Sequence, residues 1–169
     1  MWGGYYEPGT LIWRSRWVTA DAEVECREAL AFPGEAGVAI VLRQVEVLRG
    51  SAQIDVLLRP RAEYDTAPLR TVHRTDQGWT RRAGDLHLRW SGDVAEATLE
   101  PDGHGGRQLR ATFQVVVGGR VDLVLELSDR PLDTSPPGAS AAWAATAQGW
   151  AWAVPDLATP VADRDTHHA

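Results

Sequence analysis

The stretch LRATFQVVVGGRVDLVLEL, residues 109–127, decides the fold. Apolar side chains occupy every second position in each half of it: Leu109, Ala111, Phe113, Val115 and Val117, then Val121, Leu123, Leu125 and Leu127. This alternation is typical of β-strands with one face in a core, and Gly118-Gly119 marks a turn between them. A shift of one residue turns every aliphatic side chain away from the core, so the pattern fixes register as well. We expect two central strands.

Similar alternation runs through the preceding hundred or so residues. Residues 10–19 and 23–32 are each expected to form a strand, with a turn at Pro33-Gly34. Residues 69–75, 79–82 and 86–90 are expected to form a meander, because glycine-containing turns separate them. The sequence therefore predicts an antiparallel β-sandwich.

Residues 38–48 and 52–58 flank the short turn Arg49-Gly50-Ser51. Two strand patterns joined by so short a turn predict a β-hairpin. Pro60 interrupts the second strand, since proline donates no hydrogen bond. A polar loop that contains Glu63, Tyr64 and Asp65 follows it.

The composition changes after Ser128. Residues 129–140 are rich in proline, glycine and serine, so we place a domain edge here, between a sandwich over residues 1–132 and a connector and helix over residues 133–169. The segment AAWAATAQGWAWAV predicts a helix that puts Trp143, Ala147, Trp150 and Val154 on one face and Trp152 elsewhere. A helix of about 14 residues is marginal alone in water. We expect it to contact the sandwich, a helical domain that follows residue 169, or both.

Composition excludes several classes of function. The 169 residues carry a net charge of −6 with both signs interleaved, which provides no basic stripe for nucleic acid and no polybasic membrane anchor. All basic residues are arginine and asparagine is absent, which we interpret as the coding bias of a GC-rich bacterium. No stretch approaches the roughly 18 apolar residues of a membrane helix. Cys26 is the single cysteine, so an intrachain disulfide is impossible and a reducing cytoplasm is the expected location.

Several motifs together resemble the N-terminal region of bacterial glycoside hydrolase family 15 proteins, the glucoamylase-like and trehalase-like enzymes. These motifs are GGYYEPGTLIWRSRW (residues 3–17), ECREALAFP (25–33), LRPRAEYD (58–65), GDLHLRWSG (84–92), LVLELSDRPL (123–132), the tryptophan-bearing helix and DTHHA (165–169). The resemblance covers nearly all 169 residues and rests on motifs spread along the domain, not on a catalytic signature.

The resemblance implies a supersandwich-like β domain, a linker helix and then an (α/α)6 barrel with two catalytic glutamates. The resemblance also implies that no family catalytic residue lies in this chain and that the family's opening strands precede it. We therefore expect a non-catalytic domain that is inactive alone and supports a barrel that hydrolyses α-glucosidic bonds in an α-glucan or trehalose. The completeness of the sandwich stays open. Missing strands leave a sheet edge unpaired, which leads us to expect self-association.

Candidate sites are few. Arg61, Tyr64 and Asp65 lie in the polar loop and suit sugar hydroxyls, although surface hydrogen bonds suit them equally. Glu63 and Asp65 could form the separated carboxyl pair of inverting hydrolysis, but solvated loop acids are far commoner. Trp143, Trp150 and Trp152 are interpreted as a domain interface.

Two alternatives remain. Trp13, Trp17, Trp79 and Trp90 could form an aromatic platform, which would make the chain a stand-alone carbohydrate-binding module, but core packing is the commoner role of strand tryptophans. A β-barrel carrier of an apolar ligand would instead need a large enclosed cavity. We expect no cofactor and no metal, because His104, His167 and His168 lack convergent partners.

Overall fold

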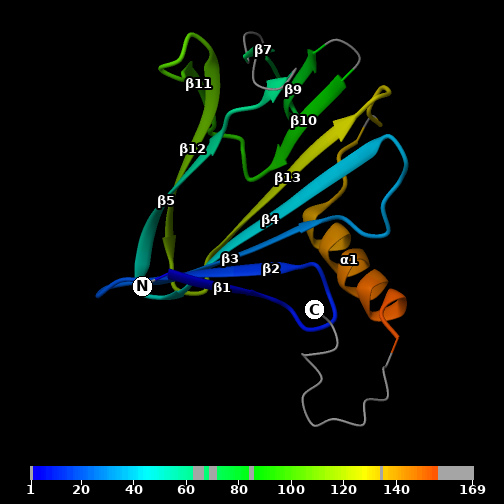
Figure 1. Ribbon diagram of the computed structural model, residues 1–169. Helices are drawn as coiled ribbons and strands as arrows, with labels where there is room; N and C mark the ends of the chain where they lie inside the picture. Colours follow the sequence, from blue (N-terminus) through cyan, green and yellow to red (C-terminus); the bar gives the residue numbers. More distant parts are fainter. Residues whose placement is uncertain (1, 63–66, 69–71, 84–85, 134, 156–169) are drawn as a thin grey trace.

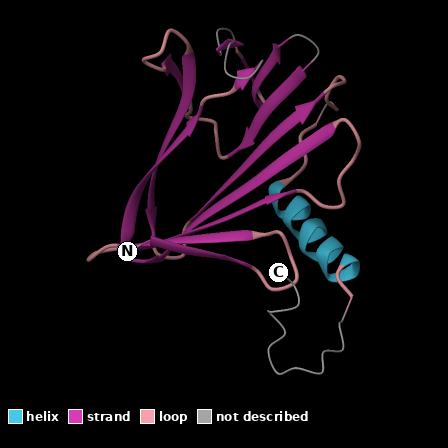
Figure 2. Cartoon of the chain, viewed as in Figure 1, coloured by secondary structure: helices cyan, strands magenta, loops and turns pink. Residues whose placement is uncertain are grey.

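The computed structural model describes residues 2–62, 67–68, 72–83, 86–133 and 135–155. Within these residues the fold is mainly β, with two packed antiparallel sheets, a two-stranded ribbon and a C-terminal helix (Figures 1 and 2). The predicted fold class, an antiparallel β-sandwich followed by a helix, is confirmed.

The larger sheet, here called the large sheet, runs across the middle of the molecule. In spatial order its strands are β1 (Trp2–Tyr6), β2 (Trp13–Val18), β3 (Glu23–Leu30), β4 (Val38–Arg49), β13 (Arg120–Ser128), β10 (Leu86–Gly92), β9 (Gly78–Ala83) and β8 (His73–Thr75). The predicted meander is confirmed for the described residues, since β8, β9 and β10 are consecutive neighbours, and residues 69–71 of its first segment lie outside them. Strand β1 has no apolar alternation in WGGYY, and sequence reasoning missed it.

The small sheet packs on one face of the large sheet. Its strands in order are β11 (Thr98–Pro101), β12 (Arg107–Val116) and β5 (Ser51–Leu58), and the short strands β6 (Arg61–Ala62) and β7 (Ala67–Pro68) pair with each other nearby. Strands β12 and β13 are both central, as predicted, but each lies in a different sheet. Figure 1 shows the two sheets diverging from a common edge.

The predicted hairpin over residues 38–58 is wrong. Strand β4 pairs with β3 and β13, whereas β5 pairs with β12, so the turn between β4 and β5 is a corner that carries the chain from one sheet to the other. Gly50 makes this corner possible because its φ is 72° and a Cβ there would lie 1.9 Å from the Asp21 carbonyl oxygen. The β12–β13 corner lies against it: Val117 N–H donates to Gly50 O (2.9 Å) and Gly118 N–H to Val47 O (2.8 Å).

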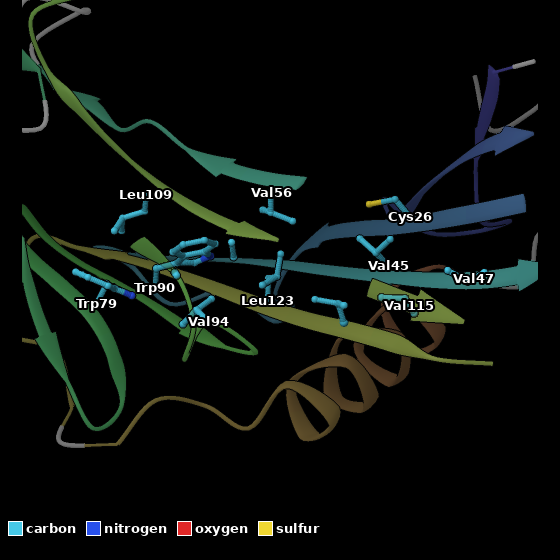
Figure 3. Close-up of a cluster of buried hydrophobic side chains, with 13 residues drawn as sticks. Cys26, Val45, Val47, Val56, Trp79, Trp90, Val94, Leu109, Val115 and Leu123 are labelled. Carbon is cyan, nitrogen blue, oxygen red and sulfur yellow. The ribbon is translucent and has the colours of Figure 1, made fainter. Parts of the chain in front are cut away.

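The main core fills the space between the two sheets. Strands β3, β4, β9, β10 and β13 contribute from the large sheet, and β5 and β12 contribute from the small one (Figure 3). Its fully or nearly fully buried members include Val47, Val94, Trp90, Leu109 and Leu123. This burial explains the period-two pattern, because one face of each strand lies in this interior.

The helix α1 (Ala139–Ala153) lies on the opposite face of the large sheet, which makes a third layer (Figure 2). A second core forms there from Ile12, Ala29, Leu42, Val124 and Trp143. The buried face of α1 contains Trp143 and Thr146 with Trp150 half-buried beside them, whereas Ala147 is exposed. The predicted helix face was therefore wrong at Ala147. Thr146 lies on the buried face instead, because its hydroxyl has a hydrogen-bond partner there.

Candidate functional site

The helix α1 is fixed on the large sheet by polar and aromatic contacts with Phe32. The Phe32 N–H donates a hydrogen bond to Thr146 Oγ1 (3.1 Å), and the rings of Phe32 and Trp150 stack at 4.4 Å with 14° between their planes. On the sheet side, the Arg27 guanidinium lies 4.6 Å from the centre of the Trp143 ring. These contacts bury Trp143 and half-bury Trp150 against other parts of this chain.

The outward face of α1 is uncharged. No charged residue occurs in Ala139–Ala153, and its exposed residues are Ser140, Ala141, Ala144, Ala145, Ala147, Gln148, Ala151, Trp152 and Ala153. The Trp152 indole is 84% exposed, the largest value among the exposed large apolar residues. A helix face with an exposed indole and no charge is typical of a surface that another protein or domain covers. Of the three predicted interface residues, Trp152 therefore remains available for contact.

A groove of about 810 Å³ opens between the large sheet and the small sheet. Strands β2, β3 and β4 line it on one side, and residues 51–57 of β5 line it on the other. Trp13 and Trp17 lie along its wall; the Trp13 ring covers the backbone at Gly4 and meets Tyr6 edge-on at 4.9 Å, while Trp17 is 42% exposed. Sequence reasoning missed this groove because strands distant in the chain form it.

Cys26 lines the same groove with its sulfur at the edge of the main core (Figure 3). Burial, with a smaller contribution from the Glu28 charge, raises the pKa of its thiol to about 12. The thiolate is the reactive form, so this pKa makes Cys26 a packing residue and not a nucleophile.

The structure separates the strand tryptophans by role. Trp90, at 3% exposed, and the nearly buried Trp79 belong to the main core, which confirms the packing interpretation for both. A platform that combines Trp13 with Trp90 is therefore excluded, because an enclosed ring cannot stack on a sugar. Trp13 and Trp17 border the groove.

The polar loop contributes one described candidate. Arg61 Nη2 donates to Asp102 Oδ2 (2.7 Å), and Asp102 Oδ1 accepts from the backbone N–H groups of His104 and Gly106, each at 2.8 Å. The hydrogen bond from His104 N–H is the main cause that lowers the Asp102 pKa, and Arg61 adds to it. Arg61 thus braces the loop that contains His104, whereas Glu63, Tyr64 and Asp65 lie outside the described residues.

Metal sites and membrane-spanning helices are both absent from the described part of the chain. There, no three histidine, cysteine, aspartate or glutamate side chains gather closely enough to hold a metal ion. No helix in the same residues has the length and apolar character needed to cross a membrane. His167 and His168 lie outside the described residues.

Comparisons with known proteins return little. No family model matches the sequence, and no curated protein matches it significantly. Among solved structures, the chain is similar to one described as "Putative kojibiose phosphorylase from human microbiome", at 6% identity and a TM-score of 0.44. The match covers 86% of this chain and 21% of that one, so this chain spans about a fifth of that protein's length.

Proposed function

We propose that this chain is the non-catalytic N-terminal β-sandwich domain of a glycoside hydrolase family 15 protein. In the parent enzyme, α1 lies against an (α/α)6 barrel that hydrolyses α-glucosidic bonds in an α-glucan or trehalose. The sequence resemblance over nearly the whole chain supports the family, and the β-sandwich with a C-terminal helix agrees with it. The single cysteine fits a bacterial cytoplasm.

The observation that carries the proposal is the outward face of α1. One side of this helix is anchored on the large sheet through Trp143 and Thr146, yet the other side exposes Trp152 among alanines. Burying a large apolar side chain stabilises by about 1.5–3 kcal/mol, so a domain that covers Trp152 gains from the contact. Alanines let a second helix approach closely, which suits packing against a helical barrel.

The DNA that follows the codon for residue 169 tests the proposal. We expect an in-frame segment that encodes a helical barrel with two catalytic glutamates. In the longer polypeptide, hydrogen exchange in residues 139–153 should slow, and Trp152→Ala should reverse this slowing while Ser140→Ala does not. An adjoining frame with no such barrel, or an α1 whose exchange is the same in both chains, contradicts the proposal.

An assay of glucose release tests whether this domain is non-catalytic. The 169-residue chain should release no glucose from maltose, maltotriose or trehalose, because the acid and base of inverting hydrolysis belong to the barrel. Turnover that persists through purification assigns the chemistry to this chain and overturns the proposal.

The stand-alone carbohydrate-binding module is the second candidate, and the partly exposed Trp17 beside the groove favours it. Titration calorimetry with maltoheptaose separates the two candidates. Binding at millimolar concentration or tighter that disappears in Trp13→Ala and Trp17→Ala supports the module, whereas no binding supports the scaffold domain. A carrier of an apolar ligand is less favoured, because the groove is open to solvent and the main core fills the rest of the space between the sheets.

A further inference from the structure

We propose that the edge of β5 that faces away from β12, which no described strand pairs with, accepts together with the groove beside it an extended segment of another polypeptide, which adds a strand to the small sheet. The segment alternates apolar side chains, which enter the groove toward Trp17, Val24 and Cys26, with basic or hydroxyl side chains, one of which lies beside Asp55. This inference goes beyond the proposed function, because it concerns the groove on the inner face of the large sheet and not the outward face of α1.

The backbone of β5 provides the first argument. Strand β5 is eight residues long and ends the small sheet, and among the described residues it pairs with β12 alone. A strand with one unpaired edge offers a row of N–H and C=O groups that another strand can pair with. The other end strands are shorter: β11 has four residues, β1 has five and β8 has three.

The groove provides the second argument. Residues 51–57 line it consecutively, so it follows the β5 edge. Across from β5, the large sheet presents Trp17, Val24, Cys26 and Val45. Side chains of a strand alternate between its two faces, so an added strand would direct every second side chain onto these apolar residues. The opposite set would lie on the outer face of the small sheet, beside the exposed Gln53 and Asp55.

Charge selects the partner. Four charged side chains line the groove: Asp21, Glu28, Asp55 and Arg43. Arg43 Nε already donates to Glu28 Oε1 (2.8 Å), which leaves an excess of negative charge. Asp55 accepts a hydrogen bond from Thr112 Oγ1 (2.6 Å), and this bond is the main cause that lowers its pKa. Arg110 Nη1 lies 3.8 Å from Asp55 Oδ1, but Arg110 Nε also donates to Glu100 Oε1 (2.9 Å), so two carboxylates share one guanidinium and a net negative charge remains. Opposite charges on neighbouring strands attract, which favours a basic residue beside Asp55.

The same charge disfavours a second copy of this chain. In an antiparallel β5–β5 pair with apolar faces matched, the registers that pair the most residues put the two Asp55 carboxylates opposite or diagonal to each other. Like charges at such positions are destabilising. A charge in the middle of an edge strand is also a common protection against self-pairing.

The test uses the whole chain and a synthetic peptide of about eight residues, the length of an ordinary strand, in which valine alternates with arginine and threonine. Two further versions carry N-methyl groups, one on the valine amides and the other on the remaining amides. A strand pairs through alternate amides, so one methylated version should bind like the parent and the other should not bind in calorimetry. Hydrogen exchange should slow at residues 51–58 when the parent peptide binds.

Charge reversal is the second arm. Asp55→Arg should weaken binding of the arginine peptide by about two- to fivefold and favour a matching glutamate peptide by a similar factor. The exposed Glu96 precedes β11 and does not line the groove, so Glu96→Arg makes the same change in charge and should leave both affinities unchanged. Asp55→Asn, which can still accept from Thr112, controls for altered folding of the arginine variant.

Three results overturn the inference. Equal binding of both methylated peptides means that the edge of β5 is not used. A dimer in light scattering with residues 51–58 protected assigns the groove to a second copy. If maltoheptaose binds in the groove and none of the peptides binds, the groove is a saccharide site.

Discussion

Glu7 ties the loop after β1 to the two strands beside it. Its carboxylate accepts hydrogen bonds from Arg14 Nε (2.8 Å) and from Arg27 Nε (2.5 Å) and Nη2 (2.9 Å). Burial alone raises the Glu7 pKa, but the hydrogen bonds and charges of the two arginines outweigh it, so the pKa lies below its ordinary value of 4.5. Because the folded pKa is lowered, this carboxylate stabilises the fold above its unfolded pKa, and the stabilisation disappears as the pH falls through the folded pKa.

Glu7→Gln should therefore lower the free energy of unfolding by about 1–2 kcal/mol at pH 7. Urea denaturation at pH 7, 5, 3 and 2 should show the difference from the unmodified chain begin to narrow near the ordinary pKa of 4.5, where the unfolded chain takes up the proton, and disappear as the pH falls through the lowered pKa of the folded chain. The exposed Glu96 supplies the control, since Glu96→Gln should change little at any pH. A difference for Glu7→Gln that stays constant from pH 7 to pH 2 contradicts the role of its charge.

Strands β4 and β5 depend on the corner at Gly50. Both Gly50 (φ 72°) and Gly118 (φ 78°) have left-handed backbones, but a Cβ at Gly50 would lie 1.9 Å from the Asp21 carbonyl oxygen, whereas nothing lies within 4 Å at Gly118. Gly118→Ala should cost about 1 kcal/mol of stability from the backbone alone. Gly50→Ala should cost at least about 2 kcal/mol more, since backbone atoms have to move. Chemical denaturation of both variants measures this, and equal losses contradict the clash.

The contact of α1 with Phe32 depends on Gly149. A glycine inside a helix normally destabilises it by about 0.5–1 kcal/mol relative to alanine, so an exposed site would gain from Gly→Ala. Here a Cβ would lie 2.7 Å from the Phe32 ring and 3.0 Å from the Phe32 carbonyl oxygen. Gly149→Ala should therefore lower the melting temperature and weaken the Phe32–Trp150 stack, which near-ultraviolet circular dichroism reports. Gln148→Ala, one residue away and exposed, should have little effect.

The contact of α1 with Phe32 and the corner at Gly50 are two features of the helix and strands that the sequence did not predict. Alternation identified the strands around residues 109–127, because burial on one face leaves a direct trace in the sequence. It could not show that two short turns connect different sheets, since a hairpin and a corner carry the same local pattern. For the helix, the sequence did contain a signal: Gly149 interrupts an alanine-rich helix, and a glycine in such a place indicates that another segment, here Phe32, approaches closely.

The molecule as a whole has three layers, and its candidate sites depend on how these layers meet. The sequence predicted tryptophans on α1 at a contact surface, because a lone alanine-rich helix needs support; which of them faces the sheet depended on Phe32 and Thr146, far apart in the chain. The groove along β5 could not be predicted. It exists because β5 ends the small sheet while β1, β2 and β3 extend the large one, and strand order is not encoded by local alternation.

A buried ion pair joins the connector before α1 to the large sheet. Arg89 on β10 and Glu126 on β13 are both buried, and the guanidinium donates to both carboxylate oxygens, from Nε (2.5 Å) and Nη2 (2.8 Å). The remaining nitrogen, Nη1, donates to the carbonyl oxygen of Asp133 (2.8 Å). The pair therefore ties the connector at Asp133, ahead of α1, to the large sheet.

Removing one partner leaves a buried charge without compensation, whereas replacing both with apolar residues removes both charges. Arg89→Met should therefore lower the free energy of unfolding by about 3–5 kcal/mol, and Arg89→Met with Glu126→Leu should recover most of this loss. The double variant still lacks the bond to Asp133, so hydrogen exchange in residues 129–133 should stay faster than in the unmodified chain even where stability returns. The partly exposed Arg110–Glu100 pair (2.9 Å) is the matched control, since its double replacement should change neither quantity much. A double variant as unstable as Arg89→Met means that the pair contributes packing and not charge balance, and unchanged exchange in the connector means that Arg89 does not position α1.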